Sequence, residues 1–540
     1  MANPPFEYHL NSKKNNSRPV VWSIAGSDSG GGAGIQADLR AFNLFGVHGC
    51  TAIAAVTAQN SLAVESIEAV SPDVLDAQLC ALAKDMPPVA IKTGMLASAE
   101  NVAVVVKWVD KLRARYPDRP VALIVDPIRR ASTGAELAKE PLRSVMMRDL
   151  LPRATLVKPN RAEAYWLVYG KDVLSGDIQD ALVPEMAKHL RQSGAQSVAI
   201  TGGDADASGE SGFWVEDWMD TPQACGWLTL PRIQSTTTHG TGCTFTASAA
   251  AAIALGFCPA DAIILAKMAT TSAVEHGYFA GNGAGVVCIR SDFSWQPDLI
   301  PFLKADKAHQ AQPFAVPANP WMGLYPIVDS AQWVKRVIAS GAQTVQLRIK
   351  SDDKRLAHST FLRDEIQRSV DYARQANVQF YVNDHWQLAI DCGAYGVHLG
   401  QEDLQTADLD AIRQAGLRLG VSTCSLWEMC RARAVLPSYI ACGPVYATNT
   451  KEMPWVVQGE HNLSYWCKVL REPVVAIAGI HGERSAQVVR CGAKGVAVVS
   501  AITQAHDPEA AIGSLQGYIR AAQELAAYEP PFLPHSTVLD

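Results

Sequence analysis

The 540-residue sequence contains few charged and few aromatic residues for its apolar content. Charged residues make up 19% and aromatic residues 7%, whereas hydrophobic residues make up 48%. Such a balance is typical of globular proteins and excludes a disordered or fibrous class. The formal net charge is −6, and the lack of basic excess argues against a nucleic-acid partner. We therefore expect small molecules as the partners.

Long apolar segments are also lacking. The longest uncharged stretch, residues 240–260, opens with Gly-Thr-Gly-Cys and contains Pro259, so we interpret it as a loop followed by a buried helix and not as a membrane span. The first 19 residues have no apolar core of the kind that a secretory signal needs. The sequence predicts a cytoplasmic protein with no membrane partner.

Paired cysteine motifs are absent. The twelve cysteines include no CxxC pair and no spacing typical of metal ligands. We expect reduced thiols that pack as small hydrophobic residues, which excludes a disulfide scaffold or a zinc module.

The length predicts at least two domains. A polar, proline-containing segment at residues 291–321 lacks sustained periodicity and is interpreted as a linker. It separates a first domain, residues 18–290, from a second, residues 322–525, and each is long enough to bury its own core.

Eight short apolar runs recur in the second domain and alternate with helical patterns such as residues 356–375. Their first residues are 324, 344, 379, 396, 418, 439, 474 and 495. This alternation predicts a (β/α)8 TIM barrel with its active site at the carboxyl ends of the strands. Polar side chains gather at those ends: Asp329, Arg348, Lys350, Asn383, Asp384, Gln401, Asp403, Ser422, Thr448 and Lys451.

The first domain also alternates between strand and helix patterns. Apolar strands are expected at residues 20–26, 50–60, 121–127, 154–160 and 197–203. The pattern predicts an α/β fold with an open, mainly parallel sheet, helices on both faces, and ligands beyond the strand ends.

A glycine-rich segment, residues 25–34, follows the first strand. Residues 32–37 fit GxGxxA, but Gln59 ends the second strand where a dinucleotide site favours an acid, and no lysine completes a Walker A loop. Two interpretations stay open: a tight strand-to-helix turn, or a backbone that closely approaches a ligand.

A second segment, Thr238–Phe245, leads into the small-residue helix. Backbone N–H groups at a helix start suit a phosphate, and the helix dipole would lower the pKa of the Cys243 thiol enough for it to act as a base. A packed structural cysteine is the alternative. In a third segment, Asn160 and Glu163 could position Mg-phosphate or cap a helix.

These segments, with GVHGCTAIAAVTAQNS, IKTGML, VDPI and KPNRAEA, resemble the ribokinase-like superfamily, specifically hydroxymethylpyrimidine/phosphomethylpyrimidine kinases. The resemblance implies a ribokinase-like α/β sandwich and two successive ATP-dependent phosphorylations. It places Gly26, Ala33, Asp38, Gln59 and Met95 at the pyrimidine, Asp126, Asn160 and Glu163 at Mg-ATP, and Gly240, Gly242 and Cys243 at the transfer step.

Two features of this domain depart from that family. Thr201-Gly-Gly-Asp204 stands where Lys-Gly-Gly-His is usual, which removes a cation and adds an acid. Arg129 follows Asp-Pro-Ile, and it would replace the missing cation only if its side chain reaches the phosphates.

In the barrel, Asp384 and Asp403 lie one βα unit apart, so both carboxylates can meet at adjacent strand ends and hold Mg²⁺. Either aspartate alone could instead cap a helix. Three cations on the same face suit phosphate groups: Arg348, Lys350 and Lys451. Gly479 and Ser500 follow strands seven and eight, where barrels commonly bind phosphate.

Motifs such as QLRIK, VND, VHLGQED and TNTK resemble thiamine-phosphate synthases. The resemblance implies coupling of hydroxymethylpyrimidine diphosphate with hydroxyethylthiazole phosphate, with Mg²⁺ on Asp384 and Asp403 and with Arg348, Lys350 and Lys451 as catalytic cations. It places Gln346, Asn383 and Ser422 at the diphosphate, and Thr448, Asn449, Thr450, Gly479, Val499 and Ser500 at the thiazole phosphate.

Cys424 and Ala478 depart from the synthase pattern, in which His and Gly are usual. Resemblance also implies a homo-oligomer. Two alternatives remain: a sugar kinase joined to another phosphate-binding barrel, and a first domain that is weakly active or only binds ligand, beside an active synthase.

Overall fold

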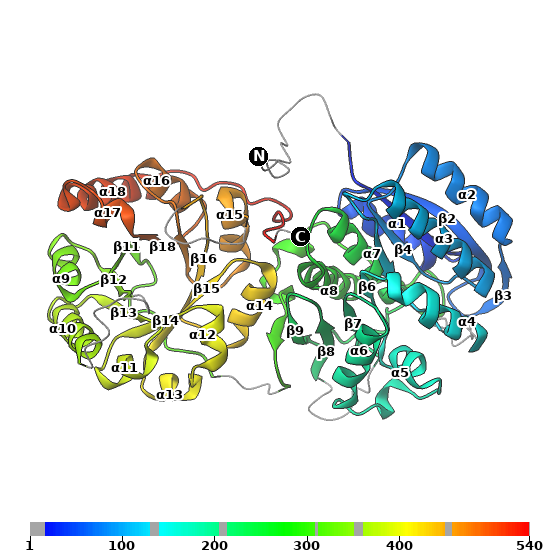
Figure 1. Ribbon diagram of the computed structural model, residues 1–540, viewed down its shortest axis with the longest axis horizontal. Helices are drawn as coiled ribbons and strands as arrows, with labels where there is room; N and C mark the ends of the chain where they lie inside the picture. Colours follow the sequence, from blue (N-terminus) through cyan, green and yellow to red (C-terminus); the bar gives the residue numbers. More distant parts are fainter. Residues whose placement is uncertain are drawn as a thin grey trace.

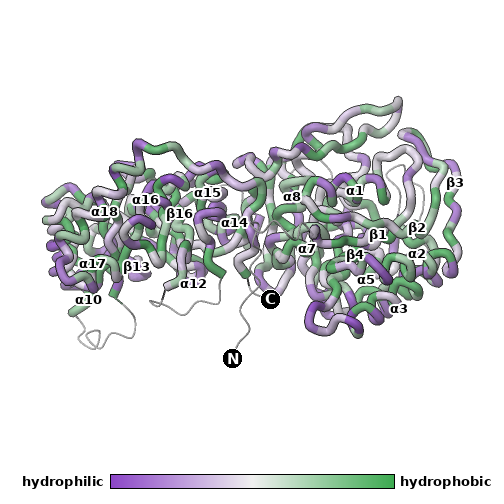
Figure 2. Tube along the Cα trace, turned by 90° about the horizontal axis from the view of Figure 1, so that it is seen from above, coloured by the Kyte–Doolittle hydropathy of each residue, from purple (hydrophilic) through white to green (hydrophobic). Residues whose placement is uncertain are grey.

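The computed structural model describes residues 17–129, 140–204, 213–307, 312–349, 360–448 and 456–538. Two bodies lie side by side, an open sheet covered by helices and a closed barrel (Figure 1). A view from above shows the same division, with hydrophobic segments inside each body (Figure 2).

The first body is built on a ten-stranded sheet with the order β10-β9-β8-β7-β6-β5-β4-β1-β2-β3. Its central pairs, from β7 to β2, are parallel, whereas β3, β8, β9 and β10 pair antiparallel at the edges. The strands are β1 (Val20–Asp28), β2 (His48–Gln59), β3 (Val64–Ala69), β4 (Ala90–Thr93), β5 (Ala122–Val125), β6 (Leu156–Val157), β7 (Val198–Ile200), β8 (Trp214–Asp220), β9 (Cys225–Pro231) and β10 (Phe302–Lys304).

Helices cover both faces of this sheet, as predicted. They are α1 (Gly34–Leu44), α2 (Pro72–Asp85), α3 (Ala99–Arg115), α4 (Glu140–Val145), α5 (Arg161–Tyr169), α6 (Leu182–Gln192), α7 (Thr241–Ala254) and α8 (Pro259–Glu275). One apolar cluster packs α1, α7 and α8 on one face, and another packs α2, α3, α5 and α6 on the other. Small side chains let α7 lie buried, which confirms the expected loop and buried helix.

The second body is a closed, all-parallel barrel of eight strands. The strands are β11 (Gly323–Val328), β12 (Thr344–Leu347), β13 (Gln379–Asn383), β14 (Gly396–Leu399), β15 (Arg418–Thr423), β16 (Tyr439–Cys442), β17 (Val474–Ile477) and β18 (Gly495–Val498). Each corresponds to one of the eight predicted apolar runs, so the barrel prediction is confirmed.

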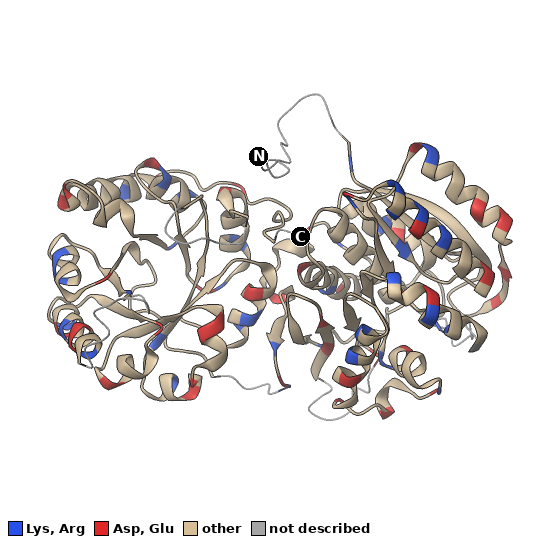
Figure 3. Ribbon diagram, in the orientation of Figure 1, with Lys and Arg blue, Asp and Glu red and all other residues tan. Residues whose placement is uncertain are grey.

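The barrel helices are α9 (Ala331–Ala339), α10 (Phe361–Gln375), α11 (Trp386–Asp391), α12 (Gln401–Thr406), α13 (Leu409–Gln414), α14 (Leu426–Ala434), α15 (Gly459–Val469), α16 (Glu483–Arg490), α17 (Ser500–Thr503) and α18 (Pro508–Gln523). The helical pattern predicted for residues 356–375 coincides with α10, and its first residues lie outside the described range. Charged residues of both signs are distributed over the outer helices of both bodies (Figure 3).

The segment between the two bodies contributes to both. Strand β10, which falls within the predicted linker, extends the first sheet by pairing with β9. Phe314, further along, is buried and lies beneath the Arg413 guanidinium of the barrel. The described parts of residues 291–321 therefore include a strand of the first sheet and a side chain packed on the barrel.

All twelve cysteines are free thiols, and seven of them are buried. This agrees with their expected role as small packed residues. Within the described part of the chain, no helix is both long and apolar enough to cross a membrane.

Candidate active sites

A cavity of about 910 Å³ opens at the carboxyl ends of the parallel strands of the first body. Sequence-distant segments line it, including the glycine-rich turn, the ends of β4 to β7, the start of α7, and α8. Among its lining residues are the following predicted site residues: Gly26, Ala33, Gln59, Met95, Asp126, Asn160, Glu163, Gly240, Gly242 and Cys243.

Asp38 requires a correction, because it does not line this cavity. It is completely buried on α1, where its two carboxylate oxygens lie 2.9 Å from the ammonium of Lys92 and Ser23 donates a hydrogen bond to it. Lys92 belongs to the cavity lining. The structure thus places Asp38 behind a cation, where it cannot contact a ligand directly.

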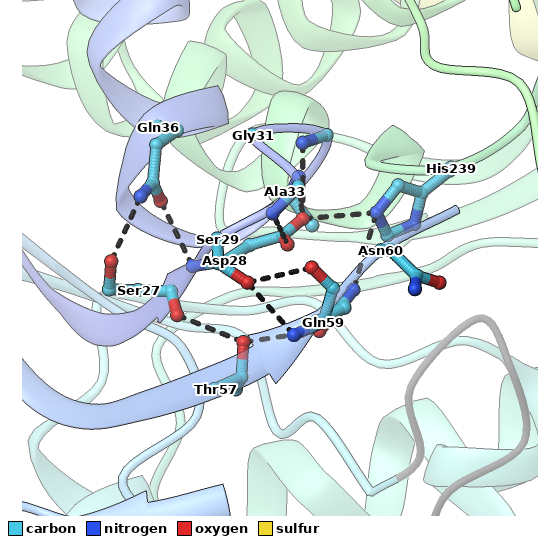
Figure 4. Close-up of polar contacts among 12 residues, drawn as sticks. Ser27, Asp28, Ser29, Gly31, Ala33, Gln36, Thr57, Gln59, Asn60 and His239 are labelled. Carbon is cyan, nitrogen blue, oxygen red and sulfur yellow. Dashed lines mark hydrogen bonds and ion pairs between the residues drawn. The ribbon is translucent and has the colours of Figure 1, made fainter. Parts of the chain in front are cut away.

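The glycine-rich turn is organised around the Asp28 carboxylate (Figure 4). Backbone N–H groups of Gly30, Gly32 and Ala33 donate to Asp28 at 2.8–3.1 Å, and the His239 ring nitrogen Nε2 lies 3.1 Å from it. Burial alone would raise the pKa of Asp28, but the hydrogen bonds from His239 and the turn lower it. The segment is therefore a tight turn, as one of the two sequence interpretations has it, and it also forms part of a cavity wall.

The second glycine motif packs directly against this turn. Gly240 has a φ of +92°, and a Cβ atom at this position would lie 2.1 Å from the carbonyl oxygen of Gly32. Only glycine satisfies both the left-handed backbone and the close approach. The two motifs, more than 200 residues apart in sequence, thereby close the cavity from two sides.

The start of α7 has no side-chain cap, and its first residues, Thr241, Gly242 and Cys243, line the cavity. The N–H groups of Gly242 and Cys243 are therefore potential anion donors, whereas that of Thr241 donates to the Thr238 carbonyl. Cys243 lies in this first turn, but the predicted lowering of its pKa is wrong. Burial raises the pKa of the thiol to about 11 and outweighs the opposing effect of Lys92. A buried thiol of this kind stays protonated at neutral pH.

An ion pair stands beside the start of α7. The Lys158 ammonium lies 3.0 Å from Asp126, and a Cβ atom on Gly242 would come within 3.1 Å of the same ammonium. Burial alone would lower the pKa of Lys158, but Asp126 and Glu163 raise it. Lys158 therefore supplies a fixed positive charge at the place where an anion would meet the helix.

Asn160 and Glu163 form a reciprocal capping box at the start of α5. Their side chains each accept a backbone N–H of the other residue, at 2.8 and 2.9 Å. Burial raises the pKa of Glu163 to about 7, with Lys158 opposing the shift and Asp126 adding to it. The capping interpretation thus holds, and both residues also line the cavity.

The two departures of this half also lie at the cavity. Asp204 accepts a hydrogen bond of 3.0 Å from Asn160 Nδ2, which places an acid where the family pattern has a histidine. Arg129 lines the cavity too, and its guanidinium is ion-paired with Asp172.

Sequence reasoning missed the two lysines, Lys92 and Lys158. Each stands within or directly after a buried apolar strand, in IKTG and LVKPN. Because a lysine is rarely buried without a partner, a lysine at the end of a buried strand predicts a nearby carboxylate or anion site. This pattern could have identified both lysines.

In the barrel, Asp384 follows β13 and Asp403 lies in the first turn of α12. Their side chains contact each other, and burial together with the charge of Asp403 raises the pKa of Asp384 to about 6, while Arg348 opposes the shift. Two carboxylates that repel each other at neutral pH fit a divalent cation, which would relieve the repulsion. The described residues contain no cluster of three or more metal-ligating side chains.

A hydrogen-bonded network fills the barrel interior behind this face. Gln346 donates to the Tyr325 hydroxyl at 3.2 Å, which lies 2.9 Å from the Tyr439 hydroxyl. Tyr439 contacts His398 Nδ1 at 2.8 Å, and His398 Nε2 contacts Ser422 Oγ at 2.8 Å. Burial lowers the pKa of His398 to about 4, so its ring is neutral. The predicted residues Gln346 and Ser422 are thus connected through three residues that sequence reasoning missed.

The remaining predicted barrel residues lie at neighbouring strand ends. Asn383 ends β13 and forms a hydrogen bond to Asp384, and Thr448 follows β16. Gly479 follows β17 with a φ of +66°, and Val499 and Ser500 form the start of α17 after β18. Two predicted catalytic cations, Lys350 and Lys451, and two predicted thiazole phosphate residues, Asn449 and Thr450, lie outside the described ranges.

The two departures of the barrel have distinct local consequences. Ala478 has a φ of +79°, a left-handed conformation that favours glycine. Cys424 begins the turn after β15, where its carbonyl accepts hydrogen bonds from Gln458 and from Thr537 near the carboxyl terminus.

Comparisons with known proteins match both halves. The sequence model of the family described as "Phosphomethylpyrimidine kinase" matches residues 28–288, and that described as "Thiamine monophosphate synthase" matches residues 324–502. A solved structure of the pyridoxal kinase from Staphylococcus aureus in complex with ADP is similar at 29% identity and a TM-score of 0.44, and covers 50% of this chain and 93% of that chain.

Relatives match one half or the whole chain. The thiamine-phosphate synthase of Serratia proteamaculans is 50% identical over 203 residues, covering 37% of this chain and 92% of that protein. The thiamine biosynthetic bifunctional enzyme TH1 of Arabidopsis thaliana, a chloroplastic protein, is 33% identical over 501 residues, which is 90% of each chain. The chain therefore belongs to the family of bifunctional thiamine biosynthetic enzymes, with a phosphomethylpyrimidine kinase in its first part and a thiamine-phosphate synthase in its second.

Proposed function

We propose that the first cavity transfers a phosphoryl group from ATP to hydroxymethylpyrimidine and then to its monophosphate. The barrel face then joins the resulting diphosphate to hydroxyethylthiazole phosphate and releases pyrophosphate. The observation that carries the first step is the meeting of two glycine motifs, an uncapped helix start and Lys158 in one cavity of about 910 Å³. Such a site suits a phosphoryl group in transfer.

In the kinase half, Gly26, Ala33, Gln59 and Met95 would contact the pyrimidine. Asp38 would act only through Lys92, which it holds in place. The backbone of Gly240, Gly242 and Cys243 would bind the phosphoryl group, with Lys158 beside it. Because the thiol of Cys243 has a raised pKa, its backbone N–H is the better candidate for a direct role.

Asp126, Asn160 and Glu163 would serve ATP and its magnesium ion. When bound, Mg²⁺ neutralises charge on the phosphate oxygens. Asp126 is already paired with Lys158, so arrival of a metal would change that contact. The raised pKa of Glu163 means that a nearby cation would favour its charged form.

In the synthase half, Asp384 and Asp403 would hold Mg²⁺ with the diphosphate, and Arg348, Lys350 and Lys451 would stabilise charge on the leaving pyrophosphate. Gln346, Asn383 and Ser422 would contact the pyrimidine diphosphate. Residues after β16, β17 and β18 would bind the thiazole phosphate: Thr448, Asn449, Thr450, Gly479, Val499 and Ser500.

We infer that the kinase domain spans residues 18–290 and the synthase domain residues 322–525. The segment between them would serve as more than a tether, because β10 belongs to the first sheet. A homo-oligomeric state and a cytoplasmic location stay predictions.

An ADP count tests the kinase proposal. The full chain with hydroxymethylpyrimidine, ATP and Mg²⁺ should release two ADP per pyrimidine, and thiamine phosphate should appear only after hydroxyethylthiazole phosphate is added. If product formed only from preformed pyrimidine diphosphate, the first half would bind ligand without catalysis. One ADP per pyrimidine would contradict the second phosphorylation.

A further inference from the structure

The turn between β15 and α14, residues 424–425, and the first two residues of α14 are held from outside the barrel on two sides. The turn directly follows β15, whose last two residues are Ser422 and Thr423. One holding residue comes from the kinase half and the other from the carboxyl-terminal tail, and neither is part of the residues that match the synthase family, 324–502.

Asp261 holds the turn from the kinase half. It lies in the first turn of α8, next to α14 (Figure 1), and is 1% exposed. Its carboxylate accepts a hydrogen bond of 2.9 Å from the backbone N–H of Trp427 and another from that of Leu426. The N-cap of α14, Ser425, accepts only the N–H of Glu428. Asp261 thus satisfies the first two donors of a barrel helix from the other half of the molecule.

Helix α8 also lines the kinase cavity through Lys267, Thr270 and Val274. The residue that caps α14 therefore stands on an element that the kinase fold fixes in place. Lys267 reinforces this position, because its ammonium is ion-paired at 2.7 Å with Asp217 of β8.

Thr537 holds the turn from the tail. Its hydroxyl donates to the Cys424 carbonyl at 2.7 Å, and its own carbonyl accepts the N–H of Val456 at 2.9 Å. Earlier in the tail, His535 and Asn462 exchange two hydrogen bonds, at 2.8 and 3.0 Å.

The tail is also attached to the segment that leaves the kinase half. Trp295 Nε1 donates to the Pro531 carbonyl at 2.7 Å, and the Phe532 ring packs edge-on against Phe293 and Trp295. The tail thus runs from the boundary of the two halves to the end of β15.

We propose that Asp261 and Thr537 are positioning residues of the synthase, which fix the β15–α14 turn and thereby the place of Ser422 in the diphosphate site. Two residues of the barrel also fix Ser422. Gln401 donates a hydrogen bond of 2.9 Å to its backbone carbonyl, and His398 contacts its hydroxyl. The proposal rests on the proposed role of Ser422. It makes the synthase of this chain dependent on its kinase half and on its tail.

The test uses Asp261→Ala and Thr537→Val in the full chain. We expect each to lower the synthase kcat/KM for preformed pyrimidine diphosphate about fivefold, the order of magnitude of a lost hydrogen bond, mainly through a raised KM. The kinase kcat/KM, measured on the same preparations, should stay within about twofold of the parent. Thr537→Ser keeps the hydroxyl and should recover the parent value.

Two matched controls separate positioning from general loosening. Asp298→Ala removes an exposed ion pair with Arg471 that also joins the connecting segment to the barrel. Ser536→Ala alters the neighbour of Thr537 without touching Cys424. Both should leave synthase kinetics unchanged.

Unchanged synthase kinetics in Asp261→Ala and Thr537→Val would overturn the proposal. An equal loss in the controls, an equal loss of kinase activity, or failure of Thr537→Ser to recover would overturn it as well. A parent chain without synthase activity would instead refute the proposed function, before any variant is compared.

Discussion

The two halves of the molecule balance charge in opposite ways. In the kinase cavity each buried lysine already has a carboxylate partner, at 2.9 Å for Lys92 with Asp38 and at 3.0 Å for Lys158 with Asp126. At the synthase face two carboxylates, Asp384 and Asp403, contact each other instead. The first site thus carries buried cations that are already paired, whereas at the second Arg348 stands near two carboxylates that we propose would hold a divalent cation.

Replacing Lys158 should break the first arrangement with the largest effect. Lys158→Met leaves Asp126 buried without its ammonium, so we expect a loss of about 3–5 kcal/mol in the free energy of unfolding and a fall of about 100-fold in kinase kcat/KM. Urea unfolding and ADP release measure the two effects.

Two further variants make that result specific. Adding Asp126→Asn should restore stability but not kinase activity, because the charge to be balanced is gone while the cation and the carboxylate proposed for Mg-ATP are both missing. Lys171→Met, which changes an exposed lysine, should affect neither quantity. Recovery of kinase activity in the double variant would argue against Lys158 as the phosphate cation.

Removing one carboxylate should break the second arrangement. We expect Asp403→Ala to lower synthase kcat/KM about 100-fold and to shift the Mg²⁺ concentration for half-maximal rate upward, because the metal loses a ligand. Kinase kcat/KM should not change. Glu402→Ala, at the exposed neighbouring position, is the control, and an equal loss there would contradict a specific metal role.

The thiol of Cys243 should matter much less than Lys158. Burial raises its pKa to about 11, so it is protonated at neutral pH and a poor base. We expect Cys243→Ala to lower kinase kcat less than about tenfold, well below the effect of about 10²–10⁴ from removing a general base. A loss of kinase kcat of about 100-fold or more would instead show that the thiol acts directly in phosphoryl transfer.

Between the halves, Asp261 should give a pH-dependent contribution to stability. Burial raises its pKa to about 7, so the folded chain holds a proton that the unfolded chain releases near pH 4. The free energy of unfolding should therefore fall as pH rises from about 4 to 7. Glu428 has a pKa raised in the same direction, so the effect of Asp261 is isolated by comparison with Asp261→Asn.

That comparison has a definite sign. The unfolding free energy of the parent should decline relative to Asp261→Asn between pH 4 and 7, as urea titrations at several pH values would measure. A constant difference across this range would show that Asp261 has the same pKa in the folded and the unfolded chain, and would contradict the raised value.

The smallest effect concerns one strained residue of the barrel. Ala478 has a φ of +79°, and glycine adopts this conformation without steric cost. We expect Ala478→Gly to stabilise the chain by about 0.5–1 kcal/mol, because relief of strain exceeds the added flexibility of the unfolded chain. Ala447→Gly changes an exposed alanine after β16 that is not in the left-handed conformation, and it should not stabilise the chain.

The barrel could be predicted from sequence because each of its strands is a short apolar run, such as β14 and β18. The antiparallel strands β8 and β9 of the first sheet could not. Strand β8 buries Glu216 and Asp217, and Asp217 is neutralised by Lys267 from α8, 50 residues away. Acidic residues conceal a strand when their partners come from a distant helix.

The same distinction holds for the sites. Glycine motifs and the spacing of Asp384 and Asp403 identify chemistry locally, so the sequence suffices to place them at strand ends. The position of Asp38 and the pKa of Cys243 depend on burial and on Lys92, which only tertiary structure determines. Likewise Asp261 acts on a helix in the other half of the chain.

Mixing two inactivated chains tests most directly whether the halves hold separate, complementary sites. Lys158→Met/Asp126→Asn and Asp403→Ala should each form little thiamine phosphate from hydroxymethylpyrimidine, hydroxyethylthiazole phosphate, ATP and Mg²⁺. An equal mixture should restore product formation, because the diphosphate made by one chain is consumed by the other. A mixture as inactive as either variant alone, although the first variant accepts preformed diphosphate, would contradict the account.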